Sequence, residues 1–169
     1  MNLFDLSGQT AVVTGASRGL GQYLAGALAA AGADLCLTSR RAADCEPFAE
    51  TLRARGRKVW TFALDVREEA SIRAFGEAVQ ADGRRIDILV NNAGCNRRKP
   101  ALEVTWDDWN TVLDTNLRGT FFVSQALAAG MCRRGYGRII NIGSVTCVAG
   151  YAGLAPDRKS TRLNSSHLV

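Results

Sequence analysis

The sequence predicts an α/β fold in which a parallel sheet carries helices on both faces. Two observations favour this fold. Short apolar runs alternate with longer segments of helical periodicity along residues 10–142. A glycine-rich turn at residues 14–21 directly follows the first apolar run. Strand–helix alternation of this kind is typical of parallel sheets, because each strand returns to the same sheet through a helix.

The predicted strands are short apolar runs. They are residues 10–14, 35–39, 59–64, 86–91 and 138–142. Short, nearly continuous apolar runs are typical of strands that are buried on both faces of a parallel sheet.

Helical segments connect these strands, and glycines close the first three of them. The predicted helices are residues 20–31, 47–55, 68–81 and 105–134. The last begins at Thr105, whose hydroxyl oxygen can accept a hydrogen bond from the backbone N–H of Asp107 or Asp108. Both acids suit the positive end of a helix.

Composition excludes several classes of protein. The chain has 169 residues, 47% of them hydrophobic and 22% charged, which fits one globular domain with a core. It has no run of eighteen apolar residues, so no membrane span is expected. The net charge of +5 is a mild excess. Because the basic residues are dispersed and no aromatic platform lies among them, we expect no nucleic-acid partner.

The cysteines and the histidine limit the chemistry. Five cysteines are scattered without a C-x-x-C pair, which indicates free thiols in a reducing cytosol. The first residues lack the basic and apolar regions of a signal peptide, so we expect a cytoplasmic protein. The one histidine is His167, so neither histidine-based catalysis nor a metal site is expected.

The turn at residues 14–21 has the features of a phosphate-binding loop. Gly15, Gly19 and Gly21 permit a sharp bend and a close approach of the backbone to a pyrophosphate. The following helix supplies N–H donors at its N-terminus. A glycine triplet also occurs in turns that are merely tight, but here a strand precedes it and an amphipathic helix follows it. We therefore expect a pyrophosphate site.

Further short motifs follow this turn in order. They are Asp65-Val66, the Asn-Asn-Ala-Gly run at residues 91–94, Asn116, and Gly143-Ser144. Together with the glycine turn, this set resembles the short-chain dehydrogenase/reductase family over residues 7–156. The resemblance implies a Rossmann-type, doubly wound sheet that binds a dinucleotide across its carboxyl edge. Residues 96–109 and 137–145 look most like the gluconate 5-dehydrogenase branch, with 3-oxoacyl-carrier-protein reductases as near relatives.

The resemblance implies a set of cofactor contacts. Asp65 would accept a hydrogen bond from the adenine amino group, and Val66 would pack beside the ring. Asn91 is expected only to tie strand ends together. The residues implied to line the pyrophosphate, the riboses and the start of the nicotinamide half are Gly15, Ser17, Gly19, Leu20, Gly21, Asn92, Ala93 and Gly94.

The end of the second strand favours NADP, with NAD as the alternative cofactor. An NAD enzyme usually places an acid there to bind the ribose 2′-hydroxyl, but this chain has Ser39-Arg40-Arg41. A guanidinium suits bidentate phosphate contact. We expect Arg40, with Ser39 and with Arg18 of the glycine turn, to bind the 2′-phosphate, and Arg41 to be solvated.

The resemblance also implies catalytic residues, of which the sequence has only part. The family uses a Tyr as acid/base and a Lys four residues on that lowers its pKa. A Ser hydrogen-bonds the substrate oxygen, and an Asn holds a water of the proton relay. Ser144 and Asn116 match these last two residues. Asp157 and Thr161 stand where the Tyr and Lys are expected, so we expect this chain to be inactive.

The segment after Pro156 differs from the rest of the chain. It is polar and aperiodic, and a back-translation of residues 157–167 resembles a common sequencing adapter read in one frame. We expect residues 1–156 to form an incomplete, C-terminally truncated dinucleotide-binding domain, and residues 157–169 to be a disordered, non-native tail. The family's sheet would then stop after the fifth strand, in the order 3-2-1-4-5, with an exposed edge that favours aggregation.

The resemblance further implies an NADP-dependent oxidoreductase that interconverts a secondary alcohol and a ketone on a small sugar acid or polyol. Arg97 and Arg98 lie in a loop that borders the substrate in the family, and they suit a carboxylate. They suit equally an acidic acyl carrier protein or plain solvation. A non-catalytic dinucleotide-binding protein is the alternative of another class. The apolar surface of the helix at residues 105–134 indicates a homo-oligomeric parent.

Overall fold

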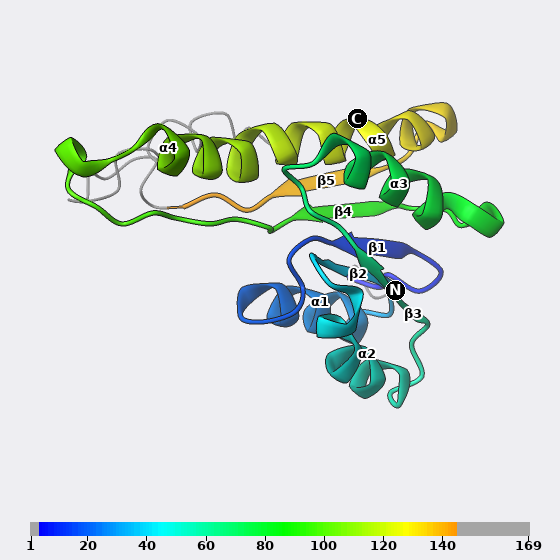
Figure 1. The fold of residues 1–169 in the computed structure, drawn as a ribbon. Helices are drawn as coiled ribbons and strands as arrows, with labels where there is room; N and C mark the ends of the chain where they lie inside the picture. The colour runs from blue at the N-terminus through cyan, green and yellow to red at the C-terminus, as the bar shows by residue number, and fades with distance from the viewer. Residues whose placement is uncertain (1–3, 145–169) are drawn as a thin grey trace.

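Five parallel strands form one sheet within residues 4–144, the part of the chain that this computed structural model describes. Their order is β3-β2-β1-β4-β5, as the family resemblance implies, and every neighbouring pair is parallel (Figure 1). The strands are β1 (Thr10–Val13), β2 (Asp34–Ser39), β3 (Val59–Ala63), β4 (Ile88–Asn91) and β5 (Arg138–Asn141). The expected domain boundary at Pro156 and the expected tail at 157–169 lie outside the described residues.

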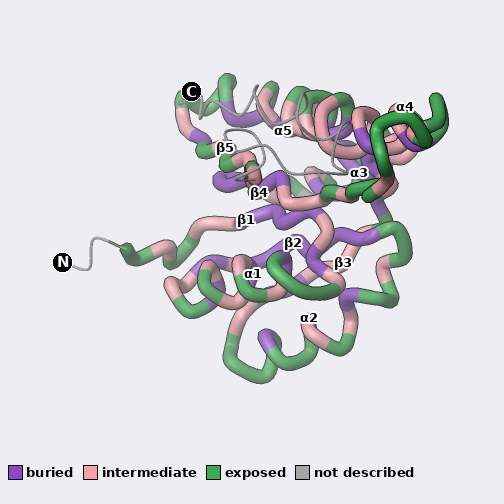
Figure 2. Tube along the Cα trace, turned by 90° about the vertical axis from the view of Figure 1, so that its left-hand side faces the viewer, coloured by how far each residue is buried: buried purple, intermediate pink, exposed green. Residues whose placement is uncertain are grey.

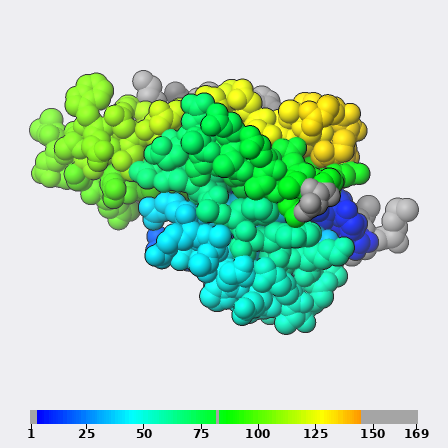
Figure 3. All heavy atoms as spheres, turned by 45° about the vertical axis from the view of Figure 1, so that its right-hand side comes forward, coloured from blue at the N-terminus to red at the C-terminus, as the bar shows by residue number. Residues whose placement is uncertain are grey.

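Helices cover both faces of this sheet. In the described part of the chain they are α1 (Leu20–Ala30), α2 (Glu46–Arg53), α3 (Glu69–Gln80), α4 (Trp106–Leu113) and α5 (Thr120–Arg134). Helices α1 and α2 lie on one face, and α3 and α5 lie on the other (Figure 1). In the space-filling view the residues of α3 lie directly against those of α5 (Figure 3). The predicted doubly wound α/β fold is confirmed.

The core is split into two layers by the sheet. Successive side chains of a strand point to opposite faces. Val13 and Leu37 therefore pack under α1 and α2, whereas Val12 and Cys36 pack under α3 and α5. All four side chains are fully buried. Buried residues follow the central strands in Figure 2, which explains why these strands are continuously apolar rather than alternating.

The predicted single helix at residues 105–134 is interrupted. A π-helical turn, Asp114–Gly119, joins α4 to α5, and the two helices run end to end (Figure 1). The hydroxyl groups of Thr115 and Thr120 donate to the carbonyls four residues earlier, a pattern that often bends helices. Gly119 lies so close to Val66 that a Cβ there would be 2.6 Å from the Val66 carbonyl oxygen. A π turn is frequent at functional sites.

Strand β5 is the edge of the described sheet. Within residues 4–144 it pairs only with β4, and Ile140 on it is 45% exposed. Within the same range, no helix combines the length and the apolar character needed to cross a bilayer.

Candidate functional site

A cavity of about 720 Å³ lies at the carboxyl ends of the central strands. Ligands of open parallel α/β sheets bind at this edge. All thirteen residues predicted to bind the cofactor line this cavity. They are Gly15, Ser17, Arg18, Gly19, Leu20, Gly21, Ser39, Arg40, Asp65, Val66, Asn92, Ala93 and Gly94. The fold therefore brings together residues from the ends of four strands.

A second cavity, of about 370 Å³, adjoins the first. Both are lined by Leu20 and by residues 92–96. The two predicted catalytic residues, Asn116 and Ser144, line the second cavity only. Ser144 is half-buried and follows the end of β5. The positions expected to hold the catalytic Tyr and Lys lie outside the described residues.

The glycine turn between β1 and α1 leaves open space in front of a helix N-terminus. Gly19 precedes α1 with a φ of +58°, and a Cβ on it would meet no atom within 4 Å. No side chain caps α1. In its first turn Gln22 and Tyr23 donate their N–H groups to the Gly19 carbonyl, which leaves, among the described contacts, those of Leu20 and Gly21 for an anion. Gly21 packs closely, because a Cβ there would lie 2.9 Å from the Ala16 Cα. This arrangement fits a pyrophosphate.

Thr14 and Asn92 join the glycine turn to the end of β4. The Thr14 hydroxyl oxygen accepts hydrogen bonds from the backbone N–H groups of Asn92 and Ala93, each at 2.9 Å. The Asn92 side-chain amide donates to the carbonyls of Thr14 at 2.9 Å and Gly15 at 3.2 Å. The Asn92 side chain therefore holds the turn in place, and its contact with a cofactor stays a prediction.

Asn91 has the tying role that the sequence suggests. Its side-chain amide donates to the Ser124 hydroxyl of α5 at 2.8 Å and to the Asn141 side chain of β5 at 2.9 Å. Asn91 is buried in the sheet. These bonds hold β4, β5 and α5 together beside the second cavity.

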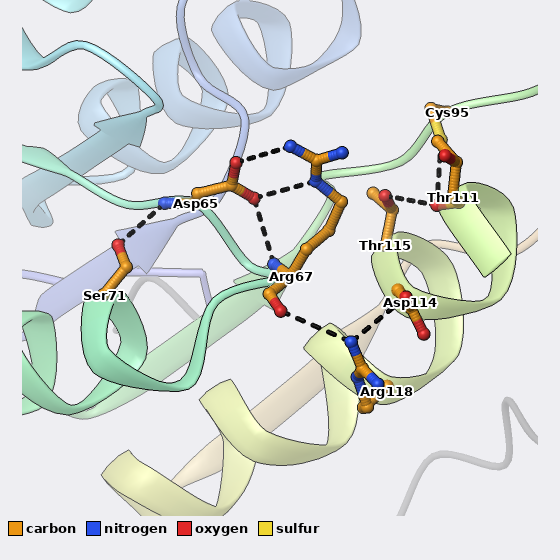
Figure 4. Close-up of polar contacts among 8 residues, drawn as sticks. All are labelled: Asp65, Arg67, Ser71, Cys95, Thr111, Asp114, Thr115 and Arg118. Atoms are coloured by element: carbon orange, nitrogen blue, oxygen red, sulfur yellow. Dashed lines mark hydrogen bonds and ion pairs between the residues drawn. The ribbon is translucent and has the colours of Figure 1, made fainter. Parts of the chain in front are cut away.

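Asp65 at the end of β3 is paired with Arg67, a residue that the sequence does not single out. Its Oδ1 accepts from the Arg67 backbone N–H at 3.0 Å and from Nε at 3.1 Å, and its Oδ2 accepts from Nη2 at 2.8 Å (Figure 4). The hydrogen bonds from the Arg67 side chain lower the pKa of Asp65, and the positive charge of Arg40 adds to this effect. Asp65 is therefore firmly ionised at the adenine end of the predicted site.

The residues after β2 present two kinds of side chain. Arg40 and Arg18 are exposed and line the larger cavity, as expected for phosphate-binding groups. The Ser39 hydroxyl instead donates to the Arg41 carbonyl at 2.6 Å and accepts from the Cys45 thiol at 3.4 Å. Because its proton is bonded to the backbone, Ser39 shapes the strand end more than it offers a donor to a ligand.

Asn116 connects the π turn to the loop after β4. Its side-chain nitrogen donates to the Cys95 carbonyl and its side-chain oxygen accepts from the Cys95 N–H, both at 2.9 Å. This two-way bond fixes the wall shared by the two cavities. The predicted role of Asn116 in holding a water stays a prediction.

The cationic loop at residues 97–99 is anchored on α4. The Asp108 carboxylate contacts Lys99 Nζ at 2.5 Å and Arg97 Nε at 3.9 Å, and it completes a capping box with Thr105. These hydrogen bonds, with that from Lys99 the strongest, lower the pKa of Asp108 to about 2. Arg97 lines the larger cavity, but Arg98 is exposed and is not among the described residues that line either one.

The parallel sheet, the glycine turn and the cavity at the carboxyl edge have the architecture of the doubly wound α/β class. A family model described as short chain dehydrogenase matches residues 9–156, and the chain belongs to this family. This result confirms the resemblance found in the sequence.

Curated relatives are similar over most of this chain. The chain is 42% identical over 155 residues to gluconate 5-dehydrogenase from Gluconobacter oxydans (strain 621H), covering 92% of this chain and 60% of that protein. It is 41% identical over 149 residues to the 3-oxoacyl-acyl-carrier-protein reductase FabG from Pseudomonas aeruginosa, covering 88% of this chain and 60% of that protein. The chain thus spans about three fifths of the length of these relatives.

Solved structures of gluconate dehydrogenases are also similar to this chain over most of its length. A putative gluconate dehydrogenase from Agrobacterium tumefaciens aligns with a TM-score of 0.91 and 40% identity, covering 94% of this chain and 63% of that one. A gluconate 5-dehydrogenase from Burkholderia cenocepacia J2315 was solved in complex with NADP and tartrate. It aligns with a TM-score of 0.89 and 39% identity, covering 94% of this chain and 62% of that one.

Proposed function

We propose that this chain is the dinucleotide-binding part of an NADP-dependent oxidoreductase that interconverts a secondary alcohol and a ketone on a sugar acid or polyol. The observation that carries the proposal is the larger cavity, where the glycine turn meets Arg18 and Arg40. Backbone N–H groups at a helix N-terminus suit a pyrophosphate, and guanidinium groups suit an additional phosphate. A relative of known structure was solved with NADP.

The chain's own residues would orient the reacting groups. The nicotinamide, when bound, supplies or accepts a hydride. Ser144 would donate a hydrogen bond to the substrate oxygen in the smaller cavity, and this bond strengthens as negative charge develops on that oxygen. Asn116 would hold a water of the proton relay beside it.

We infer that the 169-residue chain binds the dinucleotide without turning over substrate. Asp157 and Thr161 stand at the positions expected for the catalytic Tyr and Lys. An aspartate that is ionised at neutral pH has no proton to give to a substrate oxygen. A threonine supplies no positive charge that would lower the pKa of a neighbouring acid.

For the substrate we propose a sugar acid whose carboxylate is bound near Arg97. Gluconate dehydrogenases are among the similar curated proteins and solved structures, and this supports a sugar acid as the substrate. A reductase acting on an acyl chain carried by an acidic protein is the second candidate. The 41% identity to a 3-oxoacyl-acyl-carrier-protein reductase and the basic loop at residues 97–99 support it. Gluconate-type and acyl thioester substrates, assayed with the longer parent protein, discriminate the two.

A homo-oligomeric parent in a reducing, cytoplasmic setting completes the proposal. On α5, Phe121 is 60% exposed and Phe122 is 42% exposed. Their rings pack edge to face, with ring centroids 5.2 Å apart. Exposed apolar surface of this kind suits contact with another subunit. All cysteines in the described part of the chain are free thiols.

The test of the proposed function is equilibrium binding. We expect the purified chain to bind NADP more tightly than NAD in isothermal titration calorimetry. Arg40→Asp is expected to weaken NADP binding at least tenfold, or about 1.4 kcal/mol, because a carboxylate repels the 2′-phosphate. The same variant should improve NAD binding, because a carboxylate accepts a hydrogen bond from the 2′-hydroxyl. Absence of heat with both nucleotides would overturn the proposal, and an unchanged preference in the variant would remove Arg40 from it.

A further inference from the structure

The larger cavity is lined by more positively charged than negatively charged side chains. Among the described residues that line it, the guanidinium groups outnumber the carboxylates. The charged residues are Arg18, Arg40, Arg67, Arg97 and Asp65. Asp65 is therefore the one negative charge on the described wall, and it lies at the end where the sequence predicts the adenine and the 2′-phosphate.

Arg67 takes up most of the hydrogen-bonding capacity of Asp65. An ionised carboxylate offers about four acceptor sites. Arg67 fills two of them on Oδ1 and one on Oδ2 (Figure 4). What remains is one acceptor on Oδ2. A single N–H donor, such as one hydrogen of an adenine amino group, satisfies it.

The same pair affects the charge that a ligand meets. The charge of Arg40 contributes to the lowered pKa of Asp65, so these two groups lie within electrostatic range of each other. Their side chains are partly solvated, and charges in such places act over a Debye length of about 8 Å at physiological ionic strength. An unpaired Asp65 would oppose Arg40 and repel a phosphate dianion, whereas Asp65 paired with Arg67 is close to neutral.

We propose that Arg67 is a specificity-determining residue, which neutralises Asp65 and thereby favours a nucleotide with a 2′-phosphate over one with a 2′-hydroxyl. This inference rests on the proposed function. The Arg67 side chain also fixes the segment after β3, because it ties residue 67 back to Asp65 through Nε and Nη2. If fixing this segment were its only role, the loss of its side chain would weaken NADP and NAD binding equally.

The test compares three variants with the wild-type chain. Arg67→Met removes the guanidinium and leaves Asp65 charged, and the double variant Asp65→Asn/Arg67→Met removes both charges. Arg41→Met is the matched control, because it deletes a nearby guanidinium whose partner is the exposed Asp44 and which does not line the cavity. Dissociation constants for NADP and NAD are measured by calorimetry at low and high salt, and circular dichroism checks the fold.

We expect the ratio of the NAD to the NADP dissociation constant to fall about three- to tenfold in Arg67→Met. The ratio should recover in the double variant and stay unchanged in the control, and the effect should shrink at high salt. An unchanged ratio, or equal weakening of both nucleotides, would overturn the role of Arg67 while leaving the proposed function intact. If the wild-type chain binds neither nucleotide, the proposed function fails and this inference with it.

A further variant guards against misfolding of Arg67→Met. Asp65→Asn retains the guanidinium and removes the negative charge, so the preference for NADP should stay at or above the wild-type value. A reduced preference in Asp65→Asn would contradict the inference.

Discussion

At the scale of single residues, Asp108 shows how one carboxylate serves two structures. It accepts a hydrogen bond from the Thr105 backbone and so helps begin α4, and it also pairs with Lys99 of the loop after β4. The pairing with Lys99 needs the ionised form of the carboxyl group, and the hydrogen bond from Thr105 is stronger to that form. Their strength therefore depends on the pH.

We expect Asp108 to make the free energy of unfolding depend on pH in acid. Its pKa is lowered to about 2 in the folded chain, against about 3.9 for an unperturbed Asp. The stabilisation is thus fully present above about pH 4 and is lost as the pH falls towards 2. Urea unfolding followed between pH 5 and pH 2 measures this loss, and Asp108→Asn should be less stable at pH 5 with a flatter acid limb. An identical pH profile in wild type and variant would contradict this assignment.

Some residues of the candidate site could be predicted from the sequence, and others could not. The glycines of the turn, Asp65 and Arg40 were predicted because each belongs to a motif with a chemical reason at a strand end. Arg67 was not, because an arginine two residues after an aspartate is ordinary on a surface and only the folded loop turns it back onto the carboxylate. The two hydrogen bonds from the Asn92 side chain to the glycine turn were also missed, because only the folded chain brings these segments together.

At the scale of elements, the turn from β1 to α1 depends on glycine for two different reasons. Gly19 adopts a positive φ beside open space, whereas Gly21 is confined by the backbone of Gly15 and Ala16. The first position is restricted by backbone conformation, and the second by packing.

We expect Gly21→Ala to destabilise the chain by about 1–3 kcal/mol and to abolish nucleotide binding, because the added Cβ must displace backbone. Gly26→Ala, in the middle of the same helix, is the control. Its Cβ would meet only the Phe48 ring at 3.9 Å, so the variant should gain about 0.5–1 kcal/mol from the better helix propensity of alanine. Urea denaturation measures both changes, and equal stability of the two variants would contradict this account of the turn.

The elements themselves were predicted well where periodicity is strong. The strands and the first three helices start and end within two residues of the predicted bounds. The π turn at Asp114–Gly119 was not predicted, because helical periodicity continues through it and the neighbouring contact of Gly119 with Val66 joins residues far apart in the sequence. Thr111 and Thr115, which line the larger cavity from this region, were missed with it.

At the scale of the whole molecule, β5 is the described edge of a twisted parallel sheet. Among residues 4–144, no strand pairs with the side of its backbone away from β4, and Ile140 exposes apolar surface beside it. An edge of this kind is a template for pairing with another chain.

We expect the purified chain to self-associate with increasing concentration and Ile140→Lys to reduce this association several-fold, since a charged edge opposes pairing. Sedimentation velocity over a range of concentrations provides the measurement. Phe122→Lys on α5 is the comparison: if it alone abolished association, the contact would lie on the helical face and not at β5.

The Thr14–Asn92 junction has a consequence for the kinetics of ligand capture. Because side-chain and backbone bonds already lock the glycine turn to the end of β4, this wall of the cavity is preorganised before any nucleotide arrives. Little conformational entropy then remains to be lost on complex formation. Differences in affinity among nucleotides are accordingly expected in their residence times, with similar association rates for all of them.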